Sequence, residues 1–190
     1  MKAINPATEQ PLKDYPNHTD RHVIETIKAS QSAFREWKNT SFGYRADLMK
    51  KAADVLRAEQ KALARLMTDE MGKILKESEA EVEKCAWVCE FYADNAEEFL
   101  KDEIIETDAS KSYVSHRPLG IVFAIMPWNY PFWQVFRFAA PSLMAGNVAI
   151  LKHAPNVPGC AEAIVSVFEK AGFQKGFSVI YISVMSKLLM

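Results

Sequence analysis

The stretch Ile121–Asn156, IVFAIMPWNYPFWQVFRFAAPSLMAGNVAILKHAPN, decides the fold of this chain. It begins with a β-rich apolar run that stops at Pro127, and it closes with a second apolar run, VAILK, that ends at Lys152. Between the two runs lie an apolar, helix-like segment at Pro131–Ala145 and a Gly-Asn turn. A strand, a helix and a second strand in this order predict a βαβ unit. Ligands bind such sheets outside the carboxyl ends of the strands, so the polar residues there are the first candidates for a site.

Helical periodicity lies on both sides of this unit. Apolar residues that recur every three or four positions predict further helices. These are expected at residues 20–37, 44–60, 61–71, 74–98 and 158–171. Thr19 and Asp20 suit the N-terminal cap of the first helix, and Gly72 suits the end of the third.

Four further segments are expected to be extended. Two short β-rich runs around the turn TDAS, at 104–106 and 111–117, predict a hairpin. The last apolar run, 177–184, predicts another strand. Residues 4–8, INPAT, are expected to be extended and rich in turns.

The predicted fold class is α/β: an N-terminal helical region followed by the first strands of a doubly wound parallel sheet, truncated. Such a sheet needs several strands packed between helices on both faces. Residues 177–184 would form an apolar edge with nothing after them to cover it. The sequence is therefore expected to be the front of a larger protein. A small complete domain with an oligomeric partner over that edge is the alternative.

Composition excludes several classes of partner. The net charge is −1 and the sequence pI is about 6.4, so no nucleic acid and no membrane surface is expected as a partner. The longest apolar segment is interrupted by Arg137 and Pro141, and the N-terminus lacks the apolar core of a secretory signal. An odd count of three cysteines suggests a reducing compartment, so a cytoplasmic protein is expected.

No metal site is expected. Cys85 and Cys89 share a helix face, and His18 and His22 stand four residues apart, but each pair lacks further ligands. Cys160 lies at a helix start, where a thiolate would be favoured, although nothing assigns it a catalytic role.

The PWN motif, followed by helix, turn, apolar strand and LK, resembles the NAD(P)-dependent aldehyde dehydrogenase superfamily. The resemblance covers nearly the whole chain and includes INPAT, EMGK at Glu70–Lys73 and RPLG at Arg117–Gly120. It implies oxidation of a small-molecule aldehyde through a Cys thiohemiacetal, with NAD or NADP as cofactor, in a homo-oligomer. By the same resemblance, residues 1–102 form the helical front part of the cofactor-binding domain. Residues 103–119 form a hairpin of the oligomerisation region, and 120–190 form the first βαβαβ part of the NAD(P)-binding domain, with the catalytic domain absent.

Asn129 is the candidate for the oxyanion site. Its amide suits a developing negative charge, and flanking prolines stiffen the loop that holds it. The alternative is an Asn that only hydrogen-bonds its own turn. The resemblance places the cofactor cleft at Ile125, Met126, Pro127, Trp128 and Asn129, and the ribose loop at Lys152, His153, Ala154 and Pro155. Many NAD-preferring members carry Glu where this chain has Pro155, so NADP stays open.

Arg137 is the candidate for substrate selection. It is the only charge between Tyr130 and Leu151, and it is expected to be buried, where a guanidinium needs a partner. Trp133 lies one turn earlier, so the two are expected to form a pocket that grips a carboxylate. Succinate-semialdehyde dehydrogenases have an Arg at the matching position, eight residues after the oxyanion Asn. The alternative is an Arg that pairs with an acidic residue across a subunit interface.

The family's nucleophilic Cys and general-base Glu have no match in this sequence. The chain alone is therefore expected to be inactive. A non-catalytic module, which binds cofactor or associates with full-length chains, is the alternative function, and a nonfunctional relic is a third.

Overall fold

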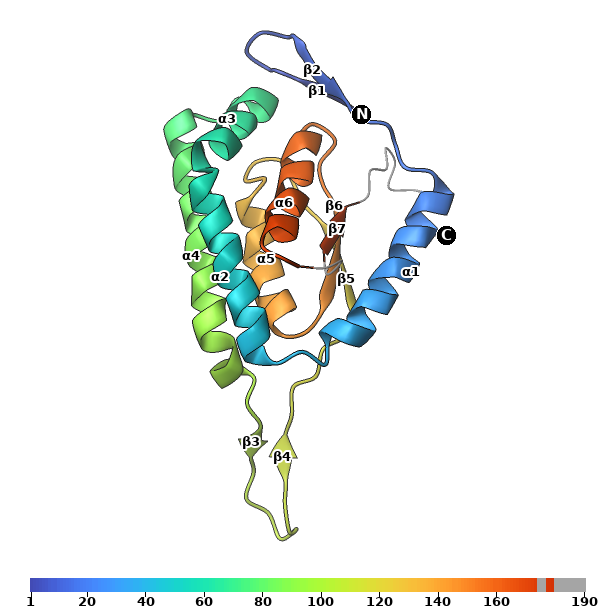
Figure 1. The fold of residues 1–190 in the computed structure, drawn as a ribbon, viewed down its shortest axis with the longest axis vertical. Coiled ribbons are helices and arrows are strands. Elements are labelled where there is room, and N and C mark those ends of the chain that lie inside the picture. The colour runs from blue at the N-terminus through green and yellow to red at the C-terminus, as the bar shows by residue number, and fades with distance from the viewer. Residues whose placement is uncertain (174–176, 180–190) are drawn as a thin grey trace.

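The computed structural model describes residues 1–173 and 177–179 of the chain (Figure 1). The helices are α1 (Asp20–Trp37), α2 (Phe42–Ala58), α3 (Gln60–Met71), α4 (Leu75–Phe99), α5 (Trp133–Met144) and α6 (Pro158–Lys170). The strands are β1 (Lys2–Ile4), β2 (Pro11–Asp14), β3 (Glu103–Ile104), β4 (Tyr113–Val114), β5 (Ile121–Ile125), β6 (Val148–Lys152) and β7 (Phe177–Val179).

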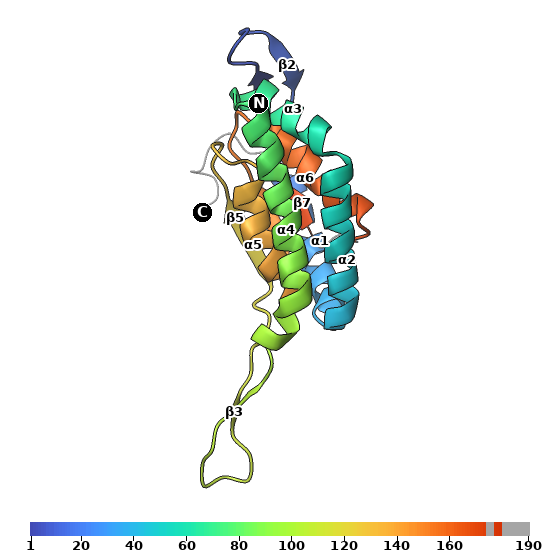
Figure 2. The same cartoon turned by 90° about the vertical axis from the view of Figure 1, so that its left-hand side faces the viewer.

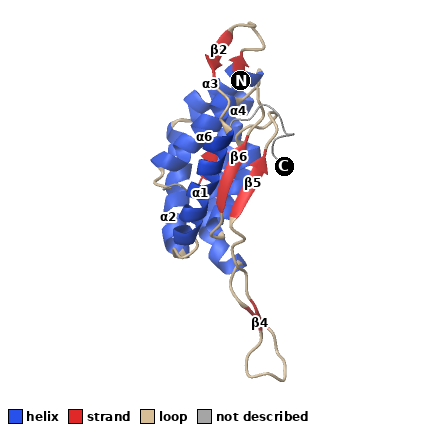
Figure 3. Ribbon diagram, turned by 90° about the vertical axis from the view of Figure 1, so that its right-hand side faces the viewer, coloured by secondary structure: helices blue, strands red, loops and turns tan. Residues whose placement is uncertain are grey.

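A parallel sheet with the strand order β5-β6-β7 forms the centre of the molecule. Figure 3 shows β5 and β6 side by side, and their register pairs Ile121 with Val148 and Ile125 with Lys152. Helix α5 connects β5 to β6, and α6 connects β6 to β7. Both helices pack on one face of the sheet, whereas α1 covers the other face (Figure 1). The predicted α/β class with helices on both faces is confirmed.

The remaining helices form an outer layer. Helix α4 lies against α5, α3 lies against α6, and α2 contacts both α5 and α6 (Figure 2). Along α4, one fully buried stripe consists of Val82, Cys85, Ala86 and Cys89, so both thiols pack as small apolar groups. Most of the buried apolar residues of this layer and of the sheet belong to one cluster, which packs the helical region against the sheet.

Local capping explains where several helices begin and end. Thr19 accepts a hydrogen bond from the backbone N–H of His22, and Gly72 ends α3 in the left-handed conformation at a φ of 75°. Both features match the sequence prediction. Helix α2 begins two residues earlier than expected, because Ser41 caps it by accepting from the N–H of Tyr44.

Two hairpins flank this body. The predicted β3–β4 hairpin is present and extends away from the helices (Figures 1 and 2). The β1–β2 hairpin was not predicted, because strands of three and four residues are too short to show an alternating pattern. Of the predicted strand 177–184, the structure describes the part that forms β7, and the remainder lies outside the described residues. Among the helices of the described residues, none is long and apolar enough to cross a membrane.

Helix α6 depends on a carboxylate from α3. No side chain of its own caps α6; instead the backbone N–H groups of Gly159 and Cys160 donate to Glu70, at 2.8 and 2.9 Å. A Cβ on Gly159 would lie 2.7 Å from Glu70 Oε1 and 2.8 Å from the Tyr15 hydroxyl. Only glycine therefore lets the carboxylate reach these amides.

Replacing Gly159 with alanine should separate Glu70 from the start of α6. We expect Gly159→Ala to lower the free energy of unfolding by about 2 kcal/mol, since two buried amides and a carboxylate lose their partners. Urea denaturation measures the change. Gly43→Ala is the matched control, because no atom lies within 4 Å of a Cβ at this helical position. Equal losses in the two variants would contradict the steric explanation.

Candidate functional site

The carboxyl ends of β5 and β6 bring the two predicted ligand segments together. The backbone N–H of Met126 donates to the carbonyl of Lys152 at 3.1 Å, one position beyond the Ile125–Lys152 pair. Ile125–Asn129 and Lys152–Pro155 therefore meet at one edge of the sheet. Within these segments, Met126 and Lys152 are half-buried, and the exposed residues are Ile125, Pro127, Trp128, Asn129 and Pro155.

Asn129 is exposed in the bend that follows β5. No hydrogen bond joins its side chain to any other described residue, so the alternative of an amide that serves its own turn finds no support in this part of the chain. The amide is available as a donor, and the sheet edge and the helix after it hold the loop on both sides.

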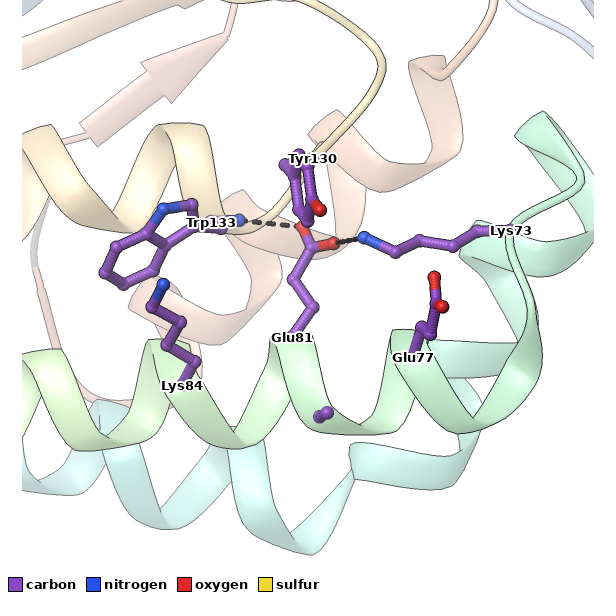
Figure 4. A pocket seen from close by; sticks show the side chains of 7 residues that line it. Lys73, Glu77, Glu81, Lys84, Tyr130 and Trp133 are labelled. Carbon is purple, nitrogen blue, oxygen red and sulfur yellow. Dashed lines mark hydrogen bonds and ion pairs between the residues drawn. The ribbon is translucent and has the colours of Figure 1, made fainter.

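Glu81 of α4 fixes the far side of this loop. Its Oε1 accepts the backbone N–H groups of Phe132 and Trp133, both at 2.9 Å, where α5 begins without a cap of its own. The other carboxylate oxygen pairs with Lys73 (Figure 4). Sequence reasoning placed Glu81 only on a helix stripe with Cys85. An acidic residue on a buried apolar stripe was the available signal, because such a side chain is seldom buried without a partner.

His153 ties the second loop to the first. Its Nε2 lies 2.9 Å from the carbonyl oxygen of Pro131, and its Nδ1 accepts the N–H of Ala154 at 2.8 Å. This pattern requires the proton on Nε2, which donates to Pro131. Burial lowers the pKa of His153 to about 4, so the ring is neutral at pH 7. In the predicted ribose loop, His153 and Ala154 are buried and Pro155 is exposed.

Both helices at this edge have their N-termini occupied. Nucleotide phosphates often bind the free N–H groups at the start of a helix. Here Glu81 takes two such groups of α5 and Glu70 takes two of α6. Neither helix offers these amides to a phosphate group.

A pocket of about 270 Å³ opens beside the Asn129 loop. Its lining consists of Lys73, Glu77, Ala80, Glu81, Lys84, Tyr130 and Trp133. Figure 4 shows Lys84 beside the indole of Trp133, and the ammonium lies 3.9 Å from the ring centroid. The half-buried Trp133 thus lines the pocket, but the cation beside it is Lys84, whereas the sequence predicted Arg137.

Arg137 departs from the sequence expectation. Its side chain is exposed, so the prediction of a buried guanidinium is wrong, and Arg137 is not among the pocket residues. Helix α5 buries another face, formed by Val135, Phe136 and Ala139, and none of the described elements covers the face that carries Arg137. Among the described residues Arg137 has no carboxylate partner.

The thiols are unreactive in character. Cys85, Cys89 and Cys160 are buried, and burial raises the pKa of each. The expectation that Cys160 favours a thiolate is wrong, because burial and the neighbouring Glu70 carboxylate outweigh the helix start. Within residues 1–173 and 177–179, no group of three His, Cys, Asp or Glu side chains could hold a metal ion.

A parallel sheet with helices on both faces and two linked loops at its carboxyl edge defines the chain as an α/β protein with a candidate ligand site at that edge. The chain matches the aldehyde dehydrogenase family over residues 1–185 and belongs to that family. The resemblance inferred from PWN, EMGK and RPLG is therefore confirmed.

Three succinate-semialdehyde dehydrogenases are similar to this chain in sequence or in structure. A probable succinate-semialdehyde dehydrogenase [NADP(+)] from Synechocystis sp. is 51% identical over 93% of this chain and 39% of its own length. Succinate-semialdehyde dehydrogenase [NADP(+)] 1 from Mycobacterium bovis is 45% identical, with the same coverage of both chains. The crystal structure of succinic semialdehyde dehydrogenase from Streptococcus pyogenes with NADP+ superimposes with a TM-score of 0.94 at 30% identity, over 98% of this chain and 41% of that one. The chain thus spans about two fifths of the length of these relatives.

The neutral His153 makes stability depend on pH. The pKa is about 4 in the folded chain against 6.5 for an ordinary His, so the unfolded chain takes up the proton first as pH falls. The contribution of His153 is complete above pH 6.5, declines between pH 6.5 and 4, and is level below that. The expected loss is up to about 3 kcal/mol.

Urea denaturation at several pH values from 4 to 8 measures this effect. His153→Gln should lack this part of the slope, whereas His116→Gln, at an exposed position, should keep it. Identical pH profiles for His153→Gln and the parent chain would show that His153 does not titrate in this way.

Proposed function

We propose that this chain is the N-terminal, cofactor-binding part of an aldehyde dehydrogenase that oxidises succinate semialdehyde to succinate. The observation that carries the proposal is the exposed amide of Asn129, which is unbonded among the described residues and lies in the loop after β5, whose last residue pairs with Lys152. Family membership and the names of the relatives support it. The nucleophilic Cys and the general base would come from the portion of the protein that these residues do not include.

Different residues of this chain are assigned to the oxyanion and to the nucleotide. The Asn129 amide donates to the oxyanion that forms when a Cys thiolate attacks the aldehyde to give a thiohemiacetal. Ile125, Met126 and Pro127 line the nucleotide cleft, and the exposed Trp128 and the half-buried Lys152 hold the nucleotide. A nicotinamide nucleotide, when bound, supplies the hydride acceptor.

The proposed cofactor is NADP. Both curated relatives carry NADP(+) in their names, and the Streptococcus structure contains NADP+. Pro155 is exposed at the ribose loop and bears no carboxylate, so nothing at this position repels a 2′-phosphate. Lys152, at the end of β6, offers a cation to the ribose or its phosphate.

Calorimetric titration of the 190-residue chain with NADP+ and with NAD+ tests the cofactor assignment. We expect NADP+ to bind more tightly, and Lys152→Ala to weaken its binding about tenfold, since a charge-assisted hydrogen bond is lost. Lys61→Ala, at an exposed position on α3, is the control and should bind as the parent does. Equal affinity for both nucleotides, or no effect of Lys152→Ala, would contradict the assignment.

Substrate selection is assigned to Trp133 and Arg137. Arg137 lies one turn after Trp133 on α5, exposed and without a carboxylate partner among the described residues, so its guanidinium is available to a ligand. By itself the chain is proposed to have no turnover, because its three thiols are buried and hold their protons.

The turnover test uses this chain joined to a catalytic portion, either its own continuation or that of the Synechocystis relative. We expect Arg137→Met to raise the KM for succinate semialdehyde about tenfold, because an ionic contact with the carboxylate is lost. The KM for butanal, which lacks the carboxylate, should change less than about twofold. Arg35→Met, exposed on α1, is the control, and the 190-residue chain alone is the blank. Equal changes for both aldehydes would favour an interface role for Arg137.

A non-catalytic subunit-association module is the second candidate. The hairpin β3–β4 extends from the body and exposes Ile104, Ile105, Tyr113 and Val114. Exposed apolar strands of this kind pair with other chains, which also supports the proposed homo-oligomer. A chain that associates but binds neither nucleotide in the titration would favour this candidate.

A further inference from the structure

The segment Glu70–Lys73, EMGK, lies outside the sheet edge yet reaches both of its loops. Glu70, at the last turn of α3, is buried and receives the amides of Gly159 and Cys160. These residues start α6 directly after the loop that follows Lys152. Burial raises the pKa of Glu70, and the two amides oppose this shift by stabilising the charged form.

Lys73 serves the other loop. Gly72, at a φ of 75°, ends the helix and turns the chain, so that Lys73 enters the core beside α4. The ammonium pairs with Glu81 and lies 3.7 Å from the ring centroid of Tyr130, the residue after Asn129 (Figure 4). Glu81 in turn holds the amides of Phe132 and Trp133.

The ion pair between Lys73 and Glu81 is buried. The side chains of Lys73 and Glu81 are 6% and 2% exposed. Removing one partner of a buried ion pair leaves the other charge uncompensated, which is strongly destabilising, whereas removing both charges is often tolerated. Neither α5 nor α6 has a side-chain cap of its own, so the two carboxylates are the caps these helices have.

We propose that Glu70 and Lys73 are positioning residues that set the two ligand-facing loops separately. Lys73 acts through Glu81 on the loop that carries Asn129. Glu70 acts through the start of α6 on the loop that follows Lys152. The assignment of oxyanion and nucleotide roles to these loops rests on the proposed function, whereas the mechanical separation of the two arms does not.

The mechanical part is tested in the 190-residue chain by amide hydrogen exchange followed by NMR. In Lys73→Met, exchange at Phe132 and Trp133 should accelerate at least about tenfold, since each amide loses a well-ordered acceptor. Exchange at Gly159 and Cys160 should stay unchanged. Glu70→Gln should give the reverse pattern. Arg65→Met is the control, because it removes an ion pair of α3 that is exposed.

The functional part is tested in the chain joined to a catalytic portion. Glu70→Gln should raise the Kd for NADP+ about tenfold and leave kcat at saturating nucleotide within about twofold. Lys73→Met should lower kcat about tenfold to a hundredfold with little change in the NADP+ Kd, because a small misplacement of a catalytic group costs this much. A merely structural role would move both readouts together.

The double variant Lys73→Met/Glu81→Gln keeps the test decisive if Lys73→Met does not fold. It removes both charges of the buried pair, and the amide that replaces the Glu81 carboxylate still offers an oxygen to both N–H groups, so kcat should exceed that of Lys73→Met at least about fivefold. Exchange that accelerates at all four amides in either single variant would overturn the proposal. So would a kcat and a Kd that change in parallel. A parent that binds no nucleotide would refute the proposed function, while the exchange pattern would still decide whether the arms are separate.

Discussion

The buried carboxylate of Glu81 is the contact on which the ligand-facing edge depends. A cap from elsewhere is needed because α5 begins at Trp133 directly after Pro131 and Phe132, neither of which carries a side-chain acceptor. A helix start leaves orphan N–H groups, and these would lie buried between α4 and α5. Glu81 satisfies two of them, and Lys73 makes the buried negative charge tolerable. The packing of α4 on α5 and the placement of the Asn129 loop are thus parts of one contact.

His153 completes the arrangement from the opposite side. It holds the carbonyl of Pro131 while Glu81 holds the next two amides, so three consecutive residues are anchored by side chains from two different elements. Proline has no N–H, so it gives its neighbours no backbone donor with which to brace the loop. External anchors from the loop after β6 and from α4 replace that bracing.

The sequence predicts the local elements of this fold better than the contacts between them. Elements with strong local patterns were predicted closely: the helix expected at 20–37 is α1, and the strand–helix–strand unit after Ile121 is β5-α5-β6. Contacts that join distant positions of the chain were not predicted. Glu81 lies 51 positions before Phe132, and Glu70 lies 89 positions before Gly159, so no periodicity connects them. The prediction that Arg137 is buried was wrong for a related reason. Apolar neighbours in the sequence predict burial, but the exposure of Arg137 depends on which elements cover that face of α5.

The occupied helix starts also constrain how a nucleotide binds. In many α/β sheets the phosphates bind the first turn of a helix, and the sugar is recognised further along. Here the start of α5 is occupied by Glu81 and the start of α6 by Glu70. Each carboxylate would repel a phosphate as well as exclude it. Lys152 is the cation that the described sheet edge still presents to solvent. Under the proposed function, a nucleotide at this edge would be oriented by its ribose end, and the loop after Lys152 that would receive it has the support of His153 and of the Glu70 cap.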